Sequence, residues 1–473
     1  CHSRGSASGL HDLADLCAVP AICGVLWFTG LLGWSGRALD PWLATLPTLV
    51  MVLAFADTLH LFYASREQGM GLSRAIREVL PAAFMTSLTS ALALGSFAVV
   101  GTDALVGLAI WGPIAVGCGF AAVCLTFPIL ARALGDAPLP PLRDFATVLR
   151  PARAGLRRPL LTVCLGVLVA LALLPTLNRA APTFSLSEHV RDASPLGRDL
   201  LYMEAEGLGS ASLFVVVDDT DGIPGLSEAD APRLAAVGEI AFSSSAATSD
   251  GPPQVPERFR AADDLSVALP VLLPLGTAPD RFGAELDGLD AALEAADLGD
   301  VTELAGQSLL SHEVVPDTVS SMRLSFYIAL FAILAVVAVS QRSLILAALA
   351  TGVSALPMMA IEAALVLTGQ GMTMTVAFAL TVAFGIAVDD TIHFLNRWRL
   401  SKGAPDVRVA EALTHAGPPM VASTLIMSLG FVATVASATA SLPIFGAFVI
   451  FALWMALIVD LGFLPSLIRM VNR

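Results

Sequence analysis

The feature that most constrains this chain is a pair of adjacent carboxylates, Asp389 and Asp390, inside an otherwise apolar run over residues 374–395. A helix that crosses a bilayer needs roughly 20 predominantly apolar residues. An ionisable residue within such a helix is costly, and by default it suggests an ion or proton pathway. The run therefore predicts a membrane helix whose acids serve a function.

The same motif occurs near the other end of the chain. An Asp-Thr-x-His string is found in each half: Asp57, Thr58 and His60, and then Asp390, Thr391 and His393. Further matches align residues 86–88 with 423–425, and Pro128 with Pro465. Both acid helices are followed by a basic loop, so both copies run the same way through the membrane. This predicts two parallel pseudo-repeated helix bundles, an arrangement from which transporters build a central site.

Composition supports a membrane protein with the lipid bilayer as its surroundings. Of 473 residues, 56% are hydrophobic and 14% charged, with a mean hydropathy of +0.77. Soluble domains are about 45–50% apolar and about 25% charged. The net charge is -14 and no basic block or stripe is present, which argues against nucleic acid as a partner. The six cysteines form no CxxC pair, so no metal site is predicted.

Ten apolar runs are long enough to span a bilayer, five on each side of a long polar stretch. They cover residues 15–35, 41–64, 79–100, 105–131, 158–177, 320–340, 343–368, 373–397, 417–438 and 442–468. The short loops rich in Lys and Arg are 66–77, 132–158, 341–342, 397–408 and 469–473. All fall on one side of the membrane, which predicts that these loops and both chain ends are cytoplasmic.

Residues 178–320 then lie on the opposite, periplasmic side, and they hold much of the acid. Residues 212–218 are rich in β-branched side chains and end at a turn signal, as a strand does. Amphipathic helices are predicted at 227–242 and 278–296. Residues 243–256 are rich in Ser, Gly and Pro and predict a loop. Together these patterns indicate a small α+β domain.

Three intramembrane acids, Asp57, Asp389 and Asp390, are the candidates for a proton relay. Asp390 lies seven residues before Arg397, roughly 10 Å at 1.5 Å per residue, which places the acids in the cytoplasmic half. A medium of low dielectric disfavours the charged carboxylate, and a second carboxylate nearby disfavours it further. If the two halves face each other, the acids form one coupled site. Asp389, which aligns with Ala56, would tune it.

Simpler roles remain open for each group. The acids could be hydrogen-bonded groups that only fix helix packing. His60 and His393 could hydrogen-bond the acids, or lie near the cytoplasmic helix ends, where a cation suits the helix dipole. Thr58 and Thr391 could support the acids or bond their own helices. Of two further membrane acids, Asp460 could satisfy backbone donors freed by Pro465, and Glu362 could face the lumen.

These motifs, above all Gly385-Ile-Ala-Val-Asp-Asp390, resemble the resistance-nodulation-division (RND) superfamily. Within it the chain is most similar to the MMPL-like predicted exporters, which are related to sterol-sensing-domain proteins. The resemblance covers nearly all of the chain. It implies family helices 3–6 in residues 1–135, a cytoplasmic linker at 136–157, helix 7 at 158–177, a ferredoxin-like porter domain at 178–320 and helices 8–12 at 321–473. Because Cys1 starts the chain without Met, we expect two family helices to be missing before it.

The resemblance implies a secondary transporter rather than an enzyme. It would export hydrophobic or amphiphilic, lipid-like molecules from the bacterial inner membrane, with protons as coupling ion and no cofactor. It leaves room for a homo-oligomer and for periplasmic partner proteins. No GxSxG, HExxH or Walker loop argues for enzyme chemistry.

The chain departs from the family pattern at several positions. Ala56 stands where the second half has Asp389, Val52 stands where it has Gly385, and the only lysine, Lys402, is in a loop. The Lys-containing relay of multidrug exporters is therefore not carried over. The departures leave an alternative function, a lipid-sensing or scaffold membrane protein that does not transport and keeps a sterol-sensing-like bundle.

Overall fold

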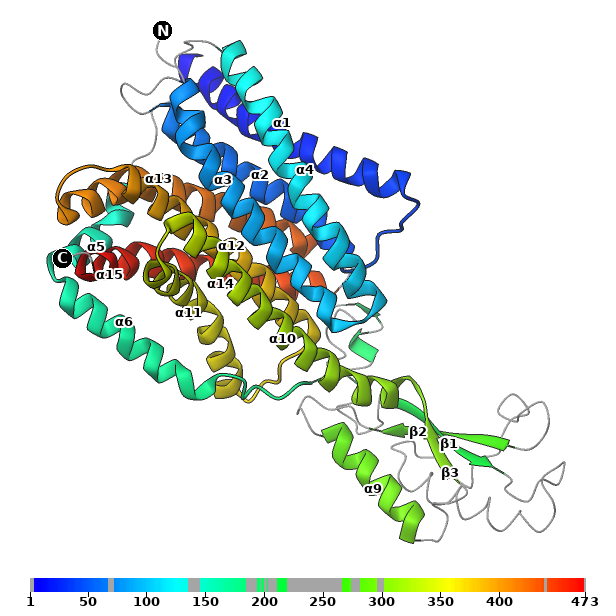
Figure 1. Ribbon diagram of the computed structural model, residues 1–473. Helices are drawn as coiled ribbons and strands as arrows, with labels where there is room; N and C mark the ends of the chain where they lie inside the picture. Colours follow the sequence, from blue (N-terminus) through cyan, green and yellow to red (C-terminus); the bar gives the residue numbers. More distant parts are fainter. Residues whose placement is uncertain are drawn as a thin grey trace, which may run out of the picture.

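The computed structural model describes residues 4–66, 72–134, 145–183, 194–195, 197–199, 202, 211–218, 266–273, 281–295, 302–437 and 440–471. They form a long helical body with a small sheet beyond one end of it (Figure 1). Within the described residues, ten helical segments are long and apolar enough to cross a bilayer. The ten predicted spans are thus confirmed as helices.

The helices fall into two groups along the chain. The first comprises α1 (Arg4–Trp34), α2 (Leu46–Ser65), α3 (Leu72–Gly95) and α4 (Asp103–Leu134). It is followed by the short α5 (Ala146–Arg157) and by α6 (Pro159–Leu173). The second comprises α10 (Gln307–Gln341), α11 (Leu344–Thr368), α12 (Met374–Leu400), α13 (Pro405–Val432), α14 (Ser441–Gly462) and α15 (Leu464–Val471).

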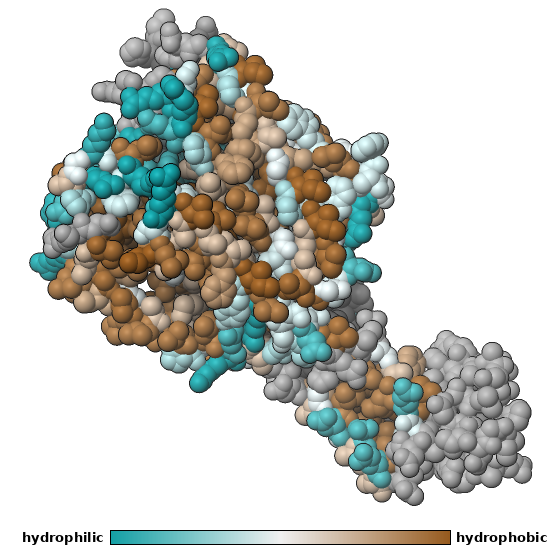
Figure 2. All heavy atoms as spheres, in the orientation of Figure 1, coloured by the Kyte–Doolittle hydropathy of each residue, from teal (hydrophilic) through white to brown (hydrophobic). Residues whose placement is uncertain are grey.

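Helix α12 is the centre of the helical body, and α6 lies at its edge. Nearly every residue of α12 is buried, whereas none of α6 is. Helix α12 packs against α3, α10, α11, α13 and α14. Figure 1 shows α6 at the edge of the helical body, where it packs on α5, α11 and α15. A helix that is apolar all round in such a place suits a lipid environment. Figure 2 shows apolar residues over much of the visible face of the helical body.

Besides α10, which packs on α3, two further helix pairs join the first group to the second. Helix α12 packs on α3, and α2 packs on α13. In the first pair a Cβ on Gly385 would lie 2.8 Å from Cβ of Ala93, and in the second a Cβ on Gly430 would lie 2.6 Å from Cγ2 of Val52. Real Cβ atoms do not come so close, so each pair needs its glycine.

The described part of the polar segment contains a three-stranded antiparallel sheet. Its strands are β1 (Ala211–Asp218), β2 (Ser266–Leu273) and β3 (Thr302–Ala305), in the order β2-β1-β3. The buried residues of β1 and β2 include Leu213, Val215 and Val271, and α9 (Arg281–Ala295) packs on β2. Strand β1 and helix α9 match the segments predicted at 212–218 and 278–296. The elements predicted at 227–242 and 243–256 lie outside the described residues.

Several helices continue beyond their apolar runs. Helix α3 begins at Leu72 and α13 at Pro405, each ahead of the hydrophobic segment that predicted it. Helix α10 begins at Gln307 and contacts β1. One continuous helix therefore crosses residue 320, where the sequence placed a domain boundary. Hydropathy marks only the part of a helix that lies in lipid, so it cannot detect such extensions.

A short strap after α6, residues 177–183, is bonded to the turn between α11 and α12. The amide of Thr183 donates to the carbonyl of Met372 over 3.0 Å, and the amide of Met372 donates to the carbonyl of Ala181 over 2.6 Å. Beneath the strap, the Arg323 guanidinium lies 3.7 Å from the Glu362 carboxylate and donates to the carbonyl of Ala180. The strap thus connects α6, α10, α11 and the start of α12.

Candidate functional site

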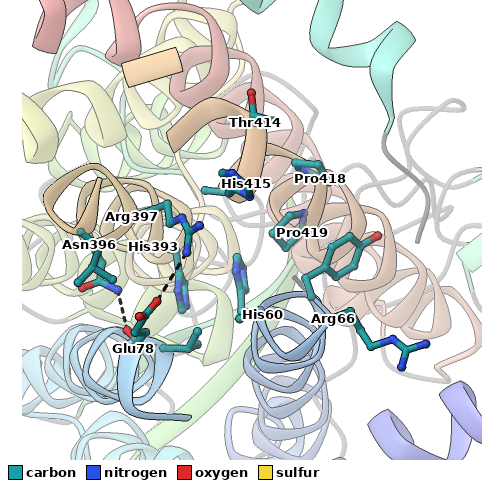
Figure 3. A pocket seen from close by; sticks show the side chains of 15 residues that line it. His60, Arg66, Glu78, His393, Asn396, Arg397, Thr414, His415, Pro418 and Pro419 are labelled. Carbon is teal, nitrogen blue, oxygen red and sulfur yellow. Dashed lines mark hydrogen bonds and ion pairs between the residues drawn. The ribbon is translucent and has the colours of Figure 1, made fainter. Parts of the chain in front are cut away.

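The two acid motifs, one from α2 and one from α12, meet at the centre of the helical body. The imidazole rings of His60 and His393 stack face to face, with centroids 3.8 Å apart and planes 3° from parallel. Both side chains are buried. Figure 3 shows the two rings beside each other among the side chains that line a pocket. Residues 333 positions apart in the chain thus form one cluster (393 minus 60).

Each histidine lies next to the carboxylate of the other motif. Nε2 of His60 is 3.8 Å from Oδ1 of Asp390, and Nε2 of His393 is 4.0 Å from Oδ1 of Asp57. These distances are too long for hydrogen bonds, but charges in a dry environment interact strongly across them. The sequence left open whether the histidines contact the acids; in the structure each histidine lies beside the acid of the other helix.

Hydroxyl groups from two further helices surround the acids. Thr86 of α3 donates to Oδ1 of Asp57 over 3.4 Å. Ser423 and Thr424 of α13 donate to Oδ1 and Oδ2 of Asp390 over 3.4 and 3.5 Å. All three are long bonds, so the carboxylates are only weakly held by neutral donors. All three hydroxyl groups belong to the segments 86–88 and 423–425, which align as equivalent parts of the two halves.

Asp389 lies on the flank of the cluster. It interacts electrostatically with Asp57 and Asp390, and Thr89 of α3 lies beside it. Among the described residues, its buried Oδ1 has no hydrogen-bond partner. Asp389 is therefore a third buried acid of the cluster, next to Asp57 and Asp390.

The two threonines of the motifs have different partners. Thr58 donates to the carbonyl of Ala54 in its own helix over 2.7 Å. Thr391 donates to Oδ1 of Asp460 on α14 over 2.7 Å and lies 3.0 Å from Oγ of Ser354 on α11. Asp460 therefore belongs to the site, although sequence reasoning gave it little weight. Its signal was present, because it is an acid within the apolar run 442–468.

A cavity of about 220 Å³ leads to the stacked histidines. It lies between the C-terminal ends of α2 and α12 and the N-terminal parts of α3 and α13. At its side, Arg397 lies 3.7 Å from the Glu78 carboxylate, and Asn396 donates to the Glu78 carbonyl over 2.9 Å (Figure 3). Polar groups at the helix ends therefore lie beside the same cavity that His60 and His393 line.

The chemistry available here is proton binding. Four carboxyl groups and two imidazoles lie together, and each can exist in a charged and a neutral form. Within the described residues, no three His, Cys, Asp or Glu side chains are placed to hold a metal ion. The cluster spans both helix groups, so a change of charge acts directly on the contact between them.

A family model described as "MMPL family" matches residues 209–473. That match includes β1 and every helix from α9 to α15. Among curated proteins, none matches the chain in sequence.

Several solved structures share the fold over 99% of this chain. SecDF in a super-membrane-facing form has 15% identity and a TM-score of 0.58, with 60% of its chain covered. SecDF from Thermus thermophilus, a translocon-associated membrane protein, has 16% identity and a TM-score of 0.58, with 62% covered. The hedgehog release protein Disp from the water bear Hypsibius dujardini has 14% identity and a TM-score of 0.61, with 71% covered. The chain thus spans about three fifths of the length of the SecDF chains.

Proposed function

This chain belongs to the MMPL family, and from that premise we propose that it is a proton-driven exporter of hydrophobic or amphiphilic, lipid-like molecules. It acts in the bacterial inner membrane as a secondary transporter, with Asp57, Asp389 and Asp390 as the proton relay. His60, His393, Thr58 and Thr391 support these acids. Protons are the coupling ion, and no cofactor takes part.

The crosswise contact of histidines and acids is the observation that carries this proposal. His60 of the first half lies beside Asp390 of the second, and His393 lies beside Asp57. A packing role would be met equally well by uncharged polar groups, which cost less in a membrane. Paired acids and imidazoles instead give the interface two charge states, and a proton-driven cycle needs both.

A pseudo-twofold relation between the halves supports one shared site. The alignment of residues 86–88 with 423–425 pairs Ala93 with Gly430, and Val52 aligns with Gly385. The contact of Gly385 with Ala93 therefore has Val52 with Gly430 as its counterpart. In one interface the glycine is on the acid helix, and in the other it is on the partner helix. Val52 fits on the acid helix of the first half because Gly430 leaves space for it on the partner helix.

Proton binding would change the contact between the halves. When the acids are charged, they repel each other in a medium that screens little. Protonation removes that repulsion and favours a different packing of α2 and α12 against their partners. A proton then has different affinity in two conformations, which is what coupling requires. The cavity beside Arg397 would open to the cytoplasm, since it lies at the basic ends of the helices.

A transport assay tests this function. The protein is reconstituted in liposomes with a fluorescent phospholipid, and lipid movement is followed with and without an imposed pH gradient. We expect movement that depends on the gradient and falls to background in Asp57→Asn and in Asp390→Asn. Asp103→Asn, at an exposed first turn of α4, is the matched control and should behave as the wild type.

Two results would contradict the proposal in different ways. Unimpaired movement in both site variants would exclude the relay. Absence of any gradient-dependent movement in the wild type, with lipid still bound, would favour the lipid-sensing or scaffold function instead.

A further inference from the structure

We infer that Asp460 on α14 is a further proton-binding residue, coupled to Asp390 and positioned by the hydroxyl of Thr391. This inference rests on the proposed proton-driven function and deepens it. Asp460 is 1% exposed and lies inside a membrane-spanning helix. Oγ1 of Thr391, the residue next to Asp390, donates to its Oδ1 over 2.7 Å. Asp460 is thus one bond from the proposed relay.

The second oxygen of Asp460 indicates that the carboxyl group binds a proton. Oδ2 is buried and, among the described residues, has no hydrogen-bond partner. Among those residues, no Lys, Arg or His side chain lies at ion-pair distance from the Asp460 carboxyl group. An ionised carboxylate held by one neutral donor inside a bilayer is strongly disfavoured. One hydrogen bond from Thr391 does not compensate a buried negative charge. The carboxyl group of Asp460 therefore keeps its proton and is neutral.

The surroundings of Asp460 connect its proton to that of Asp390. Helix α14 packs against α5, α11, α12, α13 and α15, and among the described residues no charged group of α5, α13 or α15 acts on Asp460. From α12, Asp390 is the ionisable group that acts on Asp460, and Thr391 is its donor. From α11, Ser354 contacts the same threonine over 3.0 Å; Glu362, the acid of α11, instead pairs with Arg323. Two carboxylates so placed do not ionise together, so they titrate as a coupled pair. Asp460 retains its proton while Asp390 is charged.

This proton site belongs to the second half alone. The alignment of Pro128 with Pro465 places Val123 at the position equivalent to Asp460. The equivalent threonine, Thr58, donates to its own helix at Ala54. The two halves therefore differ in how many protons they hold, although they share the Asp-Thr-x-His motif. The halves do not take equal parts in the proton cycle.

Infrared difference spectroscopy on the whole protein in lipid tests the inference directly. We expect the wild type to show the band of a buried protonated carboxyl group, and Asp460→Asn to lose one such component. Thr391→Val should shift that component by removing its donor. Thr126→Val, whose hydroxyl donates to the carbonyl of Ala122 within α4, is the matched control and should leave it unchanged. A spectrum of Asp460→Asn identical to that of the wild type would overturn the inference, and so would an identical shift in the two threonine variants.

The transport assay then separates this inference from the proposed function. Asp460→Asn should slow gradient-driven lipid movement severalfold and change its dependence on pH. If Asp57→Asn and Asp390→Asn stop movement while Asp460→Asn keeps the wild-type rate and pH profile, only the role of Asp460 is wrong. If none of the three variants changes movement, the proposed function itself fails.

Discussion

At the scale of single residues, the site is organised across helices and not along them. The motif predicted that Asp57, Asp390 and two histidines are functional neighbours. It could not predict that His60 contacts the acid of the other half, because helical periodicity describes only residues within one helix. Chain order carries no information on which face of α2 meets which face of α12.

This crosswise arrangement makes a prediction for a double-mutant cycle. His60→Asn and Asp390→Asn should not be additive in their effect on the free energy of unfolding, with an interaction energy on the order of 0.5–3 kcal/mol. Thermal unfolding of the purified protein in lipid nanodiscs measures it. The control cycle pairs His60→Asn with Asp57→Asn on the same helix, and it should give the smaller interaction energy. Equal values in the two cycles would contradict the crosswise contact.

The same residue type at equivalent motif positions also has different hydrogen-bond partners in the two halves. Thr58 and Thr391 occupy equivalent motif positions, yet one donates to its own helix and the other to Asp460. The difference arises from α14, which supplies an acid where α4 has Val123. Sequence reasoning placed Asp460 near Pro465 and left open a role as a partner of the backbone. Thr391 and Asp460 are 69 positions apart in the chain and lie on different helices. Their contact cannot be inferred from local spacing.

At the scale of elements, the two pairs α12–α3 and α2–α13 hold the halves together through close approach. The predicted spans located all four helices. The pairing depends on small residues at single positions, Gly385 in one interface and Gly430 in the other.

Replacing these glycines should therefore destabilise the protein. Gly430→Ala introduces a Cβ that meets Val52, at an expected cost of about 1–3 kcal/mol. Val52→Ala in the same chain should recover much of that loss by making room. Gly117→Ala, where nothing lies within 4 Å of an added Cβ, is the control. Thermal unfolding in lipid nanodiscs measures all three, and a neutral Gly430→Ala would show that α2 and α13 are not so close.

The ion pair beneath the strap supports a second prediction about elements. Arg323→Met leaves the buried Glu362 without its cation, which we expect to cost about 3 kcal/mol of stability. Adding Glu362→Gln removes the uncompensated charge and should restore most of it. Thermal unfolding of the single and double variants measures the difference. If the double variant is no more stable than Arg323→Met alone, the pair does not join α10 to α11 as described.

At the scale of the whole molecule, hydropathy predicts the membrane helices but not the order of strands in the sheet. Ten apolar runs predicted ten membrane helices, because a bilayer admits few alternatives to the helix. The order β2-β1-β3 was not readable, since every residue of β1 pairs with a residue at least 48 positions away on the chain (266 minus 218). The predicted orientation of the helices depends on charge in the loops and needs a test of its own.

Labelling with a membrane-impermeant maleimide tests that orientation. In a chain without its six cysteines, Asp287→Cys on α9 should react in intact cells with a permeable outer membrane. Lys402→Cys, between α12 and α13, should react only after the inner membrane is opened. Both native side chains are exposed, so access and not burial decides the result. The reverse pattern would mean that the basic loops are periplasmic.

The central claim is that the two halves form one site in which proton binding drives movement of a lipid. Its most direct test records proton flux and lipid movement together, in liposomes that contain a trapped pH indicator and a fluorescent phospholipid. We predict that protons flow down the gradient while lipid moves, and that Asp57→Asn and Asp390→Asn each abolish both signals. Lipid movement that persists in either variant without proton flux would contradict the claim.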